Sequence, residues 1–177
     1  MAAGATYEPI ATTTLASAAA TITFSSIPST YTDLKVIYVI RSTIANDFMQ
    51  ITVNGATTNY SLTYLTGDGT SASSSRTTNS SCWYFGGYGA GYIPTAANMF
   101  ALGTIDLFSY SGSTNKTALA TWSADRNGTG GATERYVGLY RSTSAITTIK
   151  LETFNSAGGS NYIAAGTTAT LYGIKAA

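Results

Sequence analysis

Short segments in which apolar and polar residues alternate recur along this chain, and turn-forming residues separate them. In residues 20–24, Ile22 and Phe24 fall on one face and threonines fall on the other, which is the pattern of a half-buried strand. Residues 48–53 repeat this pattern and are followed by an Asn-Gly turn signal. No segment has a convincing helical period, so we expect an all-β chain.

The composition of the chain agrees with this expectation. Its 177 residues include 31 Thr and 20 Ser; Thr favours the half-buried surface of a strand, while Ser, Gly and Asn favour turns. Hydrophobic residues make up 44% and charged residues 10%, the reverse of a disordered composition. A chain of this length can bury one core, so residues 1–177 are expected to form a single domain.

The spacing of the strand and turn signals predicts nine to ten antiparallel strands. Strands of even length with varied connections favour a two-sheet β-sandwich of jelly-roll type over a closed barrel. The longest loop is expected at about residues 66–81, a Ser/Thr-rich stretch with no apolar period. A loop of this length is either a contact segment or a mobile surface loop.

The expected strand at residues 34–40 is apolar on both faces. Leu34 and Val36 belong to one face, and Ile37 and Val39 to the other. A strand of this kind is covered on its second side either by a loop of the same chain or by another subunit. Both interpretations remain open at the level of sequence.

The chain lacks His and has a single Cys, Cys82, which is expected to be a small buried thiol. A Ser-His triad and a zinc site of His and Cys ligands are therefore excluded. A carboxylate pair such as Glu134 and Glu152 is the remaining route to glycoside hydrolysis, but cross-strand ion pairing explains these two residues more simply. Residues 125–129 superficially resemble a calcium loop and are expected to form a hairpin turn. We expect no enzyme activity, cofactor or metal site.

The charge pattern also limits the class of partner. The formal net charge is +1, without the Lys/Arg cluster that phosphate contacts require, so nucleic acid is not an expected partner. No stretch approaches the roughly 18 apolar residues of a membrane span, and residues 1–6 lack the regions of a signal peptide. We expect no membrane insertion and no Sec export.

Aromatic residues are densest around a glycine cluster at residues 86–91. Three interpretations are open for them: core packing, a protein interface, or a sugar-stacking surface. Together with the second face of the strand at 34–40, they give a candidate contact surface. Its members are Trp83, Tyr84, Tyr88, Tyr92, Ile37 and Val39.

Three segments carry a family resemblance: residues 7–14 (YEPIATTT), 27–34 (IPSTYTDL) and 171–176 (LYGIKA). They resemble small β-sandwich virion proteins of tailed bacteriophages. Residues 141–149 (RSTSAITTI) support the resemblance, whereas residues 66–100 carry no such signal. These motifs consist of strand and turn residues, so the resemblance implies a structural role and assigns no catalytic residues.

Within that class, the resemblance implies a capsid decoration or cement protein, made in the host cytoplasm and located in the virion. Such a protein binds the major capsid protein or other virion proteins and stabilises the particle. The alternative is a receptor-binding domain of a tail or head fibre, whose aromatic residues stack on a host-surface glycan. The chain has no fibre-like repeat, which favours decoration. Both alternatives predict a homo-oligomer, with a trimer favoured and residues 34–40 as the contact strand.

Overall fold

The computed structural model describes residues 6–86, 92–128, 130–154 and 162–175, and it is all-β over these residues. They form twelve strands and no helix. In chain order the strands are β1 (Tyr7–Thr14), β2 (Thr21–Phe24), β3 (Asp33–Ile40), β4 (Phe48–Val53), β5 (Tyr60–Gly67), β6 (Ala72–Ser80), β7 (Trp83–Phe85), β8 (Ala101–Phe108), β9 (Lys116–Asp125), β10 (Gly131–Tyr140), β11 (Ile149–Phe154) and β12 (Thr168–Ile174).

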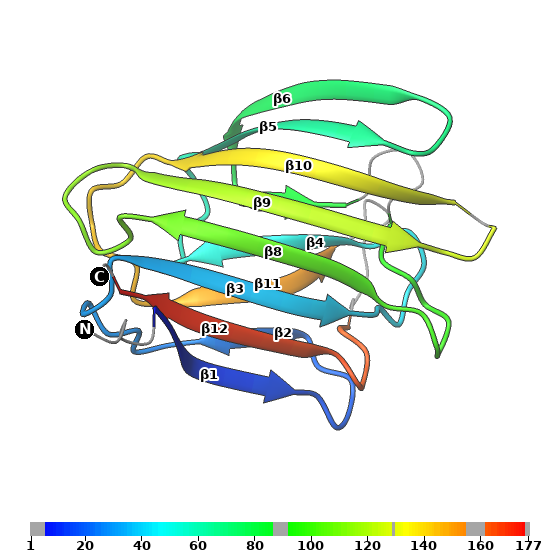
Figure 1. Ribbon diagram of the computed structural model, residues 1–177, viewed down its shortest axis with the longest axis horizontal. Coiled ribbons are helices and arrows are strands. Elements are labelled where there is room, and N and C mark those ends of the chain that lie inside the picture. The colour runs from blue at the N-terminus through cyan, green and yellow to red at the C-terminus, as the bar shows by residue number, and fades with distance from the viewer. Residues whose placement is uncertain (1–5, 87–91, 129, 155–161, 176–177) are drawn as a thin grey trace.

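The strands form two sheets, and every ladder between neighbouring strands is antiparallel. The large sheet has eight strands in the order β1-β12-β3-β8-β9-β10-β5-β6, and the small sheet has four in the order β2-β11-β4-β7. Figure 1 looks onto the large sheet, with strands of the small sheet behind it. The expected all-β antiparallel sandwich is therefore confirmed.

Eight of the strands pair in a nested order. β1 pairs with β12, β2 with β11, β3 with β8, and β4 with β7. These pairs fall alternately in the large and the small sheet. The remaining strands, β5 with β6 and β9 with β10, are inserted into this order and extend the large sheet beyond β8.

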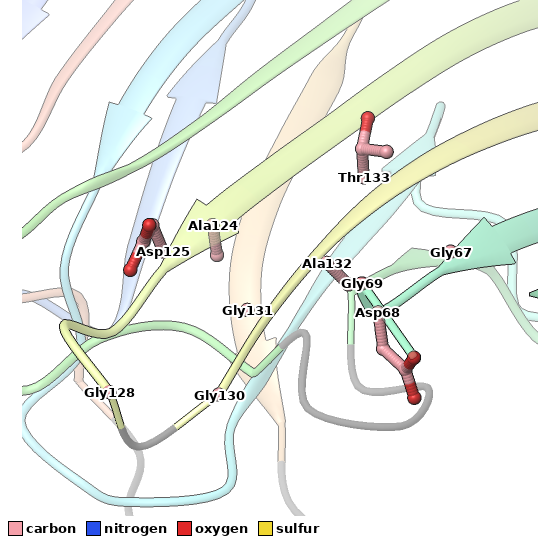
Figure 2. Close-up of a pocket in the computed structure, with 10 residues that line it drawn as sticks. All are labelled: Gly67, Asp68, Gly69, Ala124, Asp125, Gly128, Gly130, Gly131, Ala132 and Thr133. Atoms are coloured by element: carbon pink, nitrogen blue, oxygen red, sulfur yellow. The ribbon is translucent and has the colours of Figure 1, made fainter. Parts of the chain in front are cut away.

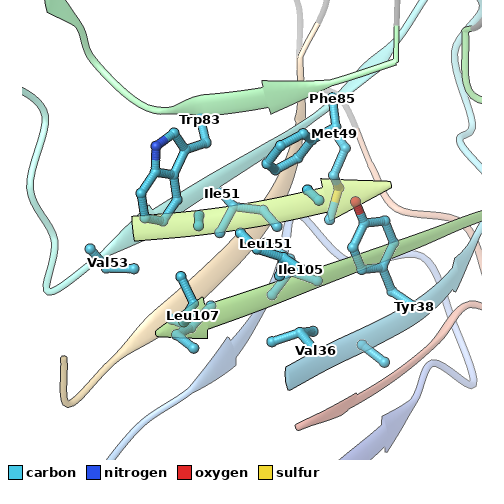
Figure 3. Packing of buried hydrophobic residues seen from close by; sticks show 14 of the residues in the cluster. Val36, Tyr38, Met49, Ile51, Val53, Trp83, Phe85, Ile105, Leu107 and Leu151 are labelled. Carbon is cyan, nitrogen blue, oxygen red and sulfur yellow. The ribbon is translucent and has the colours of Figure 1, made fainter. Parts of the chain in front are cut away.

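The core lies between the two sheets and follows from the alternation along each strand. On β3, the side chains of Leu34, Val36, Tyr38 and Ile40 are all buried, and the intervening residues point away from the core. Figure 3 shows such buried side chains gathered between the two layers. Burying one large apolar side chain stabilises the folded state by about 1.5–3 kcal/mol, so the buried side chains between the sheets make a large combined contribution to stability.

Two differences from the sequence-based expectation concern edge strands. The structure has twelve strands rather than nine to ten, and the expected loop at residues 66–81 contains β6. The side chains of β6 are mostly exposed on both faces, so an apolar period is absent even though the backbone pairs with β5. The Thr-rich β1 is likewise an edge strand held by its ladder to β12.

Candidate contact surfaces

The outward side of the large sheet is the most apolar surface that the described residues present. We call it the large-sheet face and define it as the outward-pointing residues of β1, β12, β3, β8, β9, β10 and β5. It carries six of the eight exposed large hydrophobic side chains among the described residues. These six are Tyr7, Val39, Leu65, Leu102, Phe108 and Val137. No second layer of the described chain covers this face.

Most polar groups on the large-sheet face interact with one another across neighbouring strands. The oppositely charged ends of Lys35 and Asp106 approach to 2.6 Å, and each of these side chains is about one-fifth exposed. The hydroxyl pairs are Thr104 with Thr121 at 2.7 Å, Thr14 with Thr168 at 3.0 Å, and Thr12 with Thr170 at 3.1 Å. These polar groups therefore have partners within the face and lie between its apolar side chains.

The six residues predicted as a contact surface do not lie together. Ile37 and Val39 are on the large-sheet face, where Val39 is 40% exposed. Trp83 is 0% exposed and fills the core, so its side chain offers no surface to a partner. Tyr84 is half-buried on the outward side of the small sheet. Tyr88 lies outside the described residues.

Tyr92, the last of the six, is half-buried in the segment between β7 and β8. The guanidinium carbon of Arg126 lies 5.8 Å from the centre of its ring. This contact joins Tyr92 to the turn after β9. The aromatic cluster of the sequence is therefore divided between the core and at least two different surface regions.

An aromatic group occupies the outward side of the small sheet. The rings of Phe48 and Phe154 meet edge to face at 5.2 Å, and those of Phe48 and Tyr84 at 6.0 Å. These residues line a shallow pocket of about 390 Å³ together with Gln50. The Tyr84 hydroxyl is hydrogen-bonded to Thr77 of β6, which fixes the ring in place. We call Phe48, Tyr84 and Phe154 the small-sheet aromatics.

Two carboxylates line an open pocket of about 500 Å³ at one end of the large sheet. Figure 2 shows Asp68 and Asp125 on either side of β10, with several glycines between them. Asp68 accepts backbone hydrogen bonds from Ser71 at 2.7 Å and Thr70 at 2.9 Å, which hold the pKa of its carboxyl below the ordinary value. Asp125 accepts one from the N–H of Asn127 at 2.8 Å. Both carboxylates therefore stabilise turns.

The segment that superficially resembles a calcium loop connects β9 to β10. Asn127 and Gly128 have φ values of 52° and 86°, and the N–H of Arg126 donates to the carbonyl of Gly130 at 2.8 Å. These are the features of a tight hairpin turn. In the part of the chain that the structure describes, no three His, Cys, Asp or Glu side chains cluster closely enough to hold a metal ion.

Glu134 and Glu152 differ from the expected cross-strand ion pairs. Glu134 is 3% exposed and points into the core, where it accepts hydrogen bonds from Tyr136 and from the N–H of Gly86 at 3.0 Å. Burial and then the Glu134 charge raise the pKa of the Tyr136 hydroxyl. Glu152 lies in the other sheet and pairs with Lys150 of its own strand at 3.0 Å. The cross-strand prediction was wrong because alternation places Glu134 on the inner face.

Comparisons with known proteins add no relative. No family model, curated protein or solved structure matches this chain. Among the described residues, none forms a helix that could cross a membrane.

Five exposed apolar residues of the large-sheet face were missed by sequence reasoning: Tyr7, Leu65, Leu102, Phe108 and Val137. Each is adjacent in its strand to a residue whose side chain points inward; Leu102, for example, lies between Ala101 and Gly103. The available signal was a strand with apolar residues on both faces, the same signal that identified Ile37 and Val39. For Leu102 and Val137, small inward neighbours such as Ala101, Gly103 and Gly138 weakened the apolar pattern of the inner face.

Proposed function

We propose that this chain is a non-enzymatic structural protein of a bacteriophage virion. In this proposal it is a capsid decoration or cement protein, which binds the lattice of the major capsid protein and stabilises the particle. The nested pairing of strands is the observation that carries the proposal.

The nested order supports assignment to the jelly-roll type. Pairing the first strand with the last, the second with the last but one, and so on, is what results when a long antiparallel ladder is rolled into two sheets. In this chain the rolled strands are β1 to β4, β7, β8, β11 and β12, and the two inserted strand pairs widen one sheet. Jelly rolls recur in viral capsid proteins and in lectins, so the topology favours these two classes without deciding between them.

The segments that carry the family resemblance lie side by side in the fold. Residues 7–14 form β1, residues 171–174 end β12, and residues 27–34 lead into β3. These three strands are consecutive at one edge of the large sheet. Lys175 of the last segment also pairs with Glu8 of the first at 2.8 Å. The resemblance therefore concerns one structural unit, which supports a common fold with the virion proteins.

The surfaces support binding over a broad area. The carboxylates of the open pocket stabilise turns, and Glu134 is enclosed in the core. The large-sheet face, in contrast, is wide, carries most of the exposed large hydrophobic side chains of the described residues, and bears charges of both signs. A wide face of this kind suits contact with another protein better than it suits binding of a small substrate.

The proposal is tested by locating the protein on intact particles of the phage that encodes it. Gold-labelled antibodies against the chain should bind the capsid surface, and particles lacking the chain should lose infectivity at lower temperature while adsorbing normally to cells. Unchanged heat resistance together with labelling of the tail would refute the proposal.

A receptor-binding domain is the second candidate, and the small-sheet aromatics favour it. Exposed aromatic rings beside amide and hydroxyl groups are suited to stacking on sugar rings and hydrogen-bonding their hydroxyls. Phe154 is 42% exposed, and Gln50 lies in the same pocket. The labelling experiment distinguishes the candidates, because a receptor-binding domain would be labelled at a fibre tip and its loss would abolish adsorption.

A further inference from the structure

We infer that the large-sheet face is a self-association surface, on which a second copy of this chain packs face to face about a two-fold axis. The inference goes beyond the proposed function, which takes the same face as a general protein-binding surface, because it names a second copy of this chain as the protein bound there. Three properties of the face carry it: apolar content, internal pairing of polar groups, and size.

The apolar content is unusual for a surface exposed to water. Leu102 and Val137 are each 47% exposed and lie on the same sheet, with β9 between their strands; Leu102 is level with Ser123 of β9 and Val137 with Leu119. Removing such side chains from water is favourable by about 25 cal/mol per Å² of apolar area. The outward side of the small sheet carries one such residue, Phe154, among the exposed large hydrophobic side chains of the described residues, against six on the large-sheet face. Covering the large-sheet face would therefore remove more exposed apolar side chains from water than covering the outward side of the small sheet.

Internal pairing lowers the cost of removing water from this face. A buried hydroxyl or charge without a partner costs free energy, but the Thr104 and Thr121 hydroxyls already bond each other at 2.7 Å. Lys35 and Asp106 likewise form an ion pair at 2.6 Å. A second surface can cover these groups without supplying new hydrogen-bond partners. A sugar-binding surface would need the reverse, namely donors and acceptors free to reach the ligand.

The size of the face matches the requirement of a stable dimer. The seven strands of the face, each occupying about 4.8 Å of width and presenting at least seven residues of about 3.3 Å, give a flat area of about 34 by 23 Å, or roughly 800 Å². A standard protein interface buries about 800 Å² on each partner. One continuous face of this area is enough for one partner.

The charges of the face favour a second copy as the partner. Lys35 and Asp106 neutralise each other, and the other outward charged residues, Asp33, Asp125 and Arg135, include both signs, so two copies meet without strong repulsion. A self-complementary face closes a two-fold assembly, with two sheets packed about 10 Å apart and their strands nearly aligned. In the trimer that the sequence favoured, each chain would contact two neighbouring chains, and both contacts would have to share this one face.

The test measures the mass of the purified full chain by sedimentation velocity over a range of concentrations. The wild-type chain should sediment as a dimer. Val137→Asp on β10 and Leu102→Asp on β8 should each weaken dimerisation at least about tenfold, because they bury a charge in the interface. Phe154→Asp is the matched control, since it replaces an equally exposed apolar residue on the other sheet and should leave the dimer intact.

Circular dichroism of each variant checks that the fold is retained, which is expected because both side chains already contact water. A wild-type chain that remains monomeric at its highest soluble concentration would overturn the inference. So would a dimer lost in Phe154→Asp but kept in Val137→Asp, or a trimer in place of the dimer. None of these results would alter the location of the protein on the particle, so failure here is distinct from failure of the proposed function.

Discussion

At the scale of single residues, Glu134 connects the two sheets from within the core. Its Oε2 accepts a hydrogen bond from the N–H of Gly86, which follows β7 of the small sheet, while Glu134 itself belongs to β10 of the large sheet. The Tyr136 hydroxyl donates to the same oxygen, and the Thr66 hydroxyl donates to Oε1 at 3.4 Å. A buried carboxylate is tolerated only when its oxygens accept such bonds.

We expect Glu134→Ala to lower the free energy of unfolding by about 2–4 kcal/mol, because it removes the acceptor shared by Gly86 and Tyr136. Glu134→Gln keeps one acceptor oxygen and should lose less. Urea unfolding followed by tryptophan fluorescence measures both. The outward neighbour Thr133 provides the control, since Thr133→Ala should change the stability by no more than about 0.5 kcal/mol. Equal losses in Glu134→Ala and Thr133→Ala would contradict this role.

At the scale of strands, aromatic rings lie across glycines on the inner face of the large sheet. A Cβ added to Gly103 of β8 would lie 2.1 Å from the ring of Tyr38, and one added to Gly138 of β10 would lie 2.6 Å from Nε1 of Trp83. Because glycine has no side chain, these two positions leave room for the Tyr38 and Trp83 rings between the two sheets. These glycines therefore set the close packing of the core.

Gly103→Ala should destabilise the protein by about 2–3 kcal/mol, because the added methyl group must displace the Tyr38 ring in a packed core. Gly67→Ala is the matched control: it lies in β5 of the same sheet, and the nearest atom to an added Cβ is 4.0 Å away. Thermal unfolding by circular dichroism compares the two variants. A Gly103→Ala protein as stable as Gly67→Ala would show that the Tyr38 ring has room to move.

The strands also show what sequence can and cannot predict. β2 and β4 were predictable because each alternates between a buried and a solvent-facing side. β6 was not, because an edge strand exposed on both sides is held by backbone hydrogen bonds that leave no hydrophobic pattern. Ile37 and Val39 were identifiable as surface candidates from a strand apolar on both faces. The place of Trp83 was not, because the side of a sheet that becomes the core depends on which strands pair.

At the scale of the whole molecule, buried phenols and a buried thiol make the fold sensitive to alkaline pH. Burial raises the pKa of the Tyr38, Tyr60 and Tyr136 hydroxyls above their ordinary value, and it raises the pKa of the Cys82 thiol to about 11. The folded state then keeps protons that the unfolded chain releases. This contribution to stability is complete below about pH 9 and is lost as the pH rises through the folded-state values.

The unfolding temperature should therefore fall progressively above about pH 9 to 10, with tyrosinate absorbance appearing together with loss of native structure. Between pH 6 and 8 it should be nearly constant, because the chain has no His to titrate. Thermal unfolding at a series of pH values, with absorbance at an ultraviolet wavelength specific for tyrosinate, checks both. A constant unfolding temperature up to pH 11 would contradict the burial of these groups.

The nested strand order has a consequence for when the protein can fold during its synthesis. Thr12 of β1 and Thr170 of β12, which face each other in the finished sheet, are 158 residues apart. β12 lies between β1 and β3 and pairs with both. This edge of the large sheet therefore cannot form until residues 168–174 have left the ribosome. Closure of so long a loop makes folding slow. The large sheet is thus completed only once β12 has been synthesised, and until then the paired edges of β1 and β3 stay open to other strands.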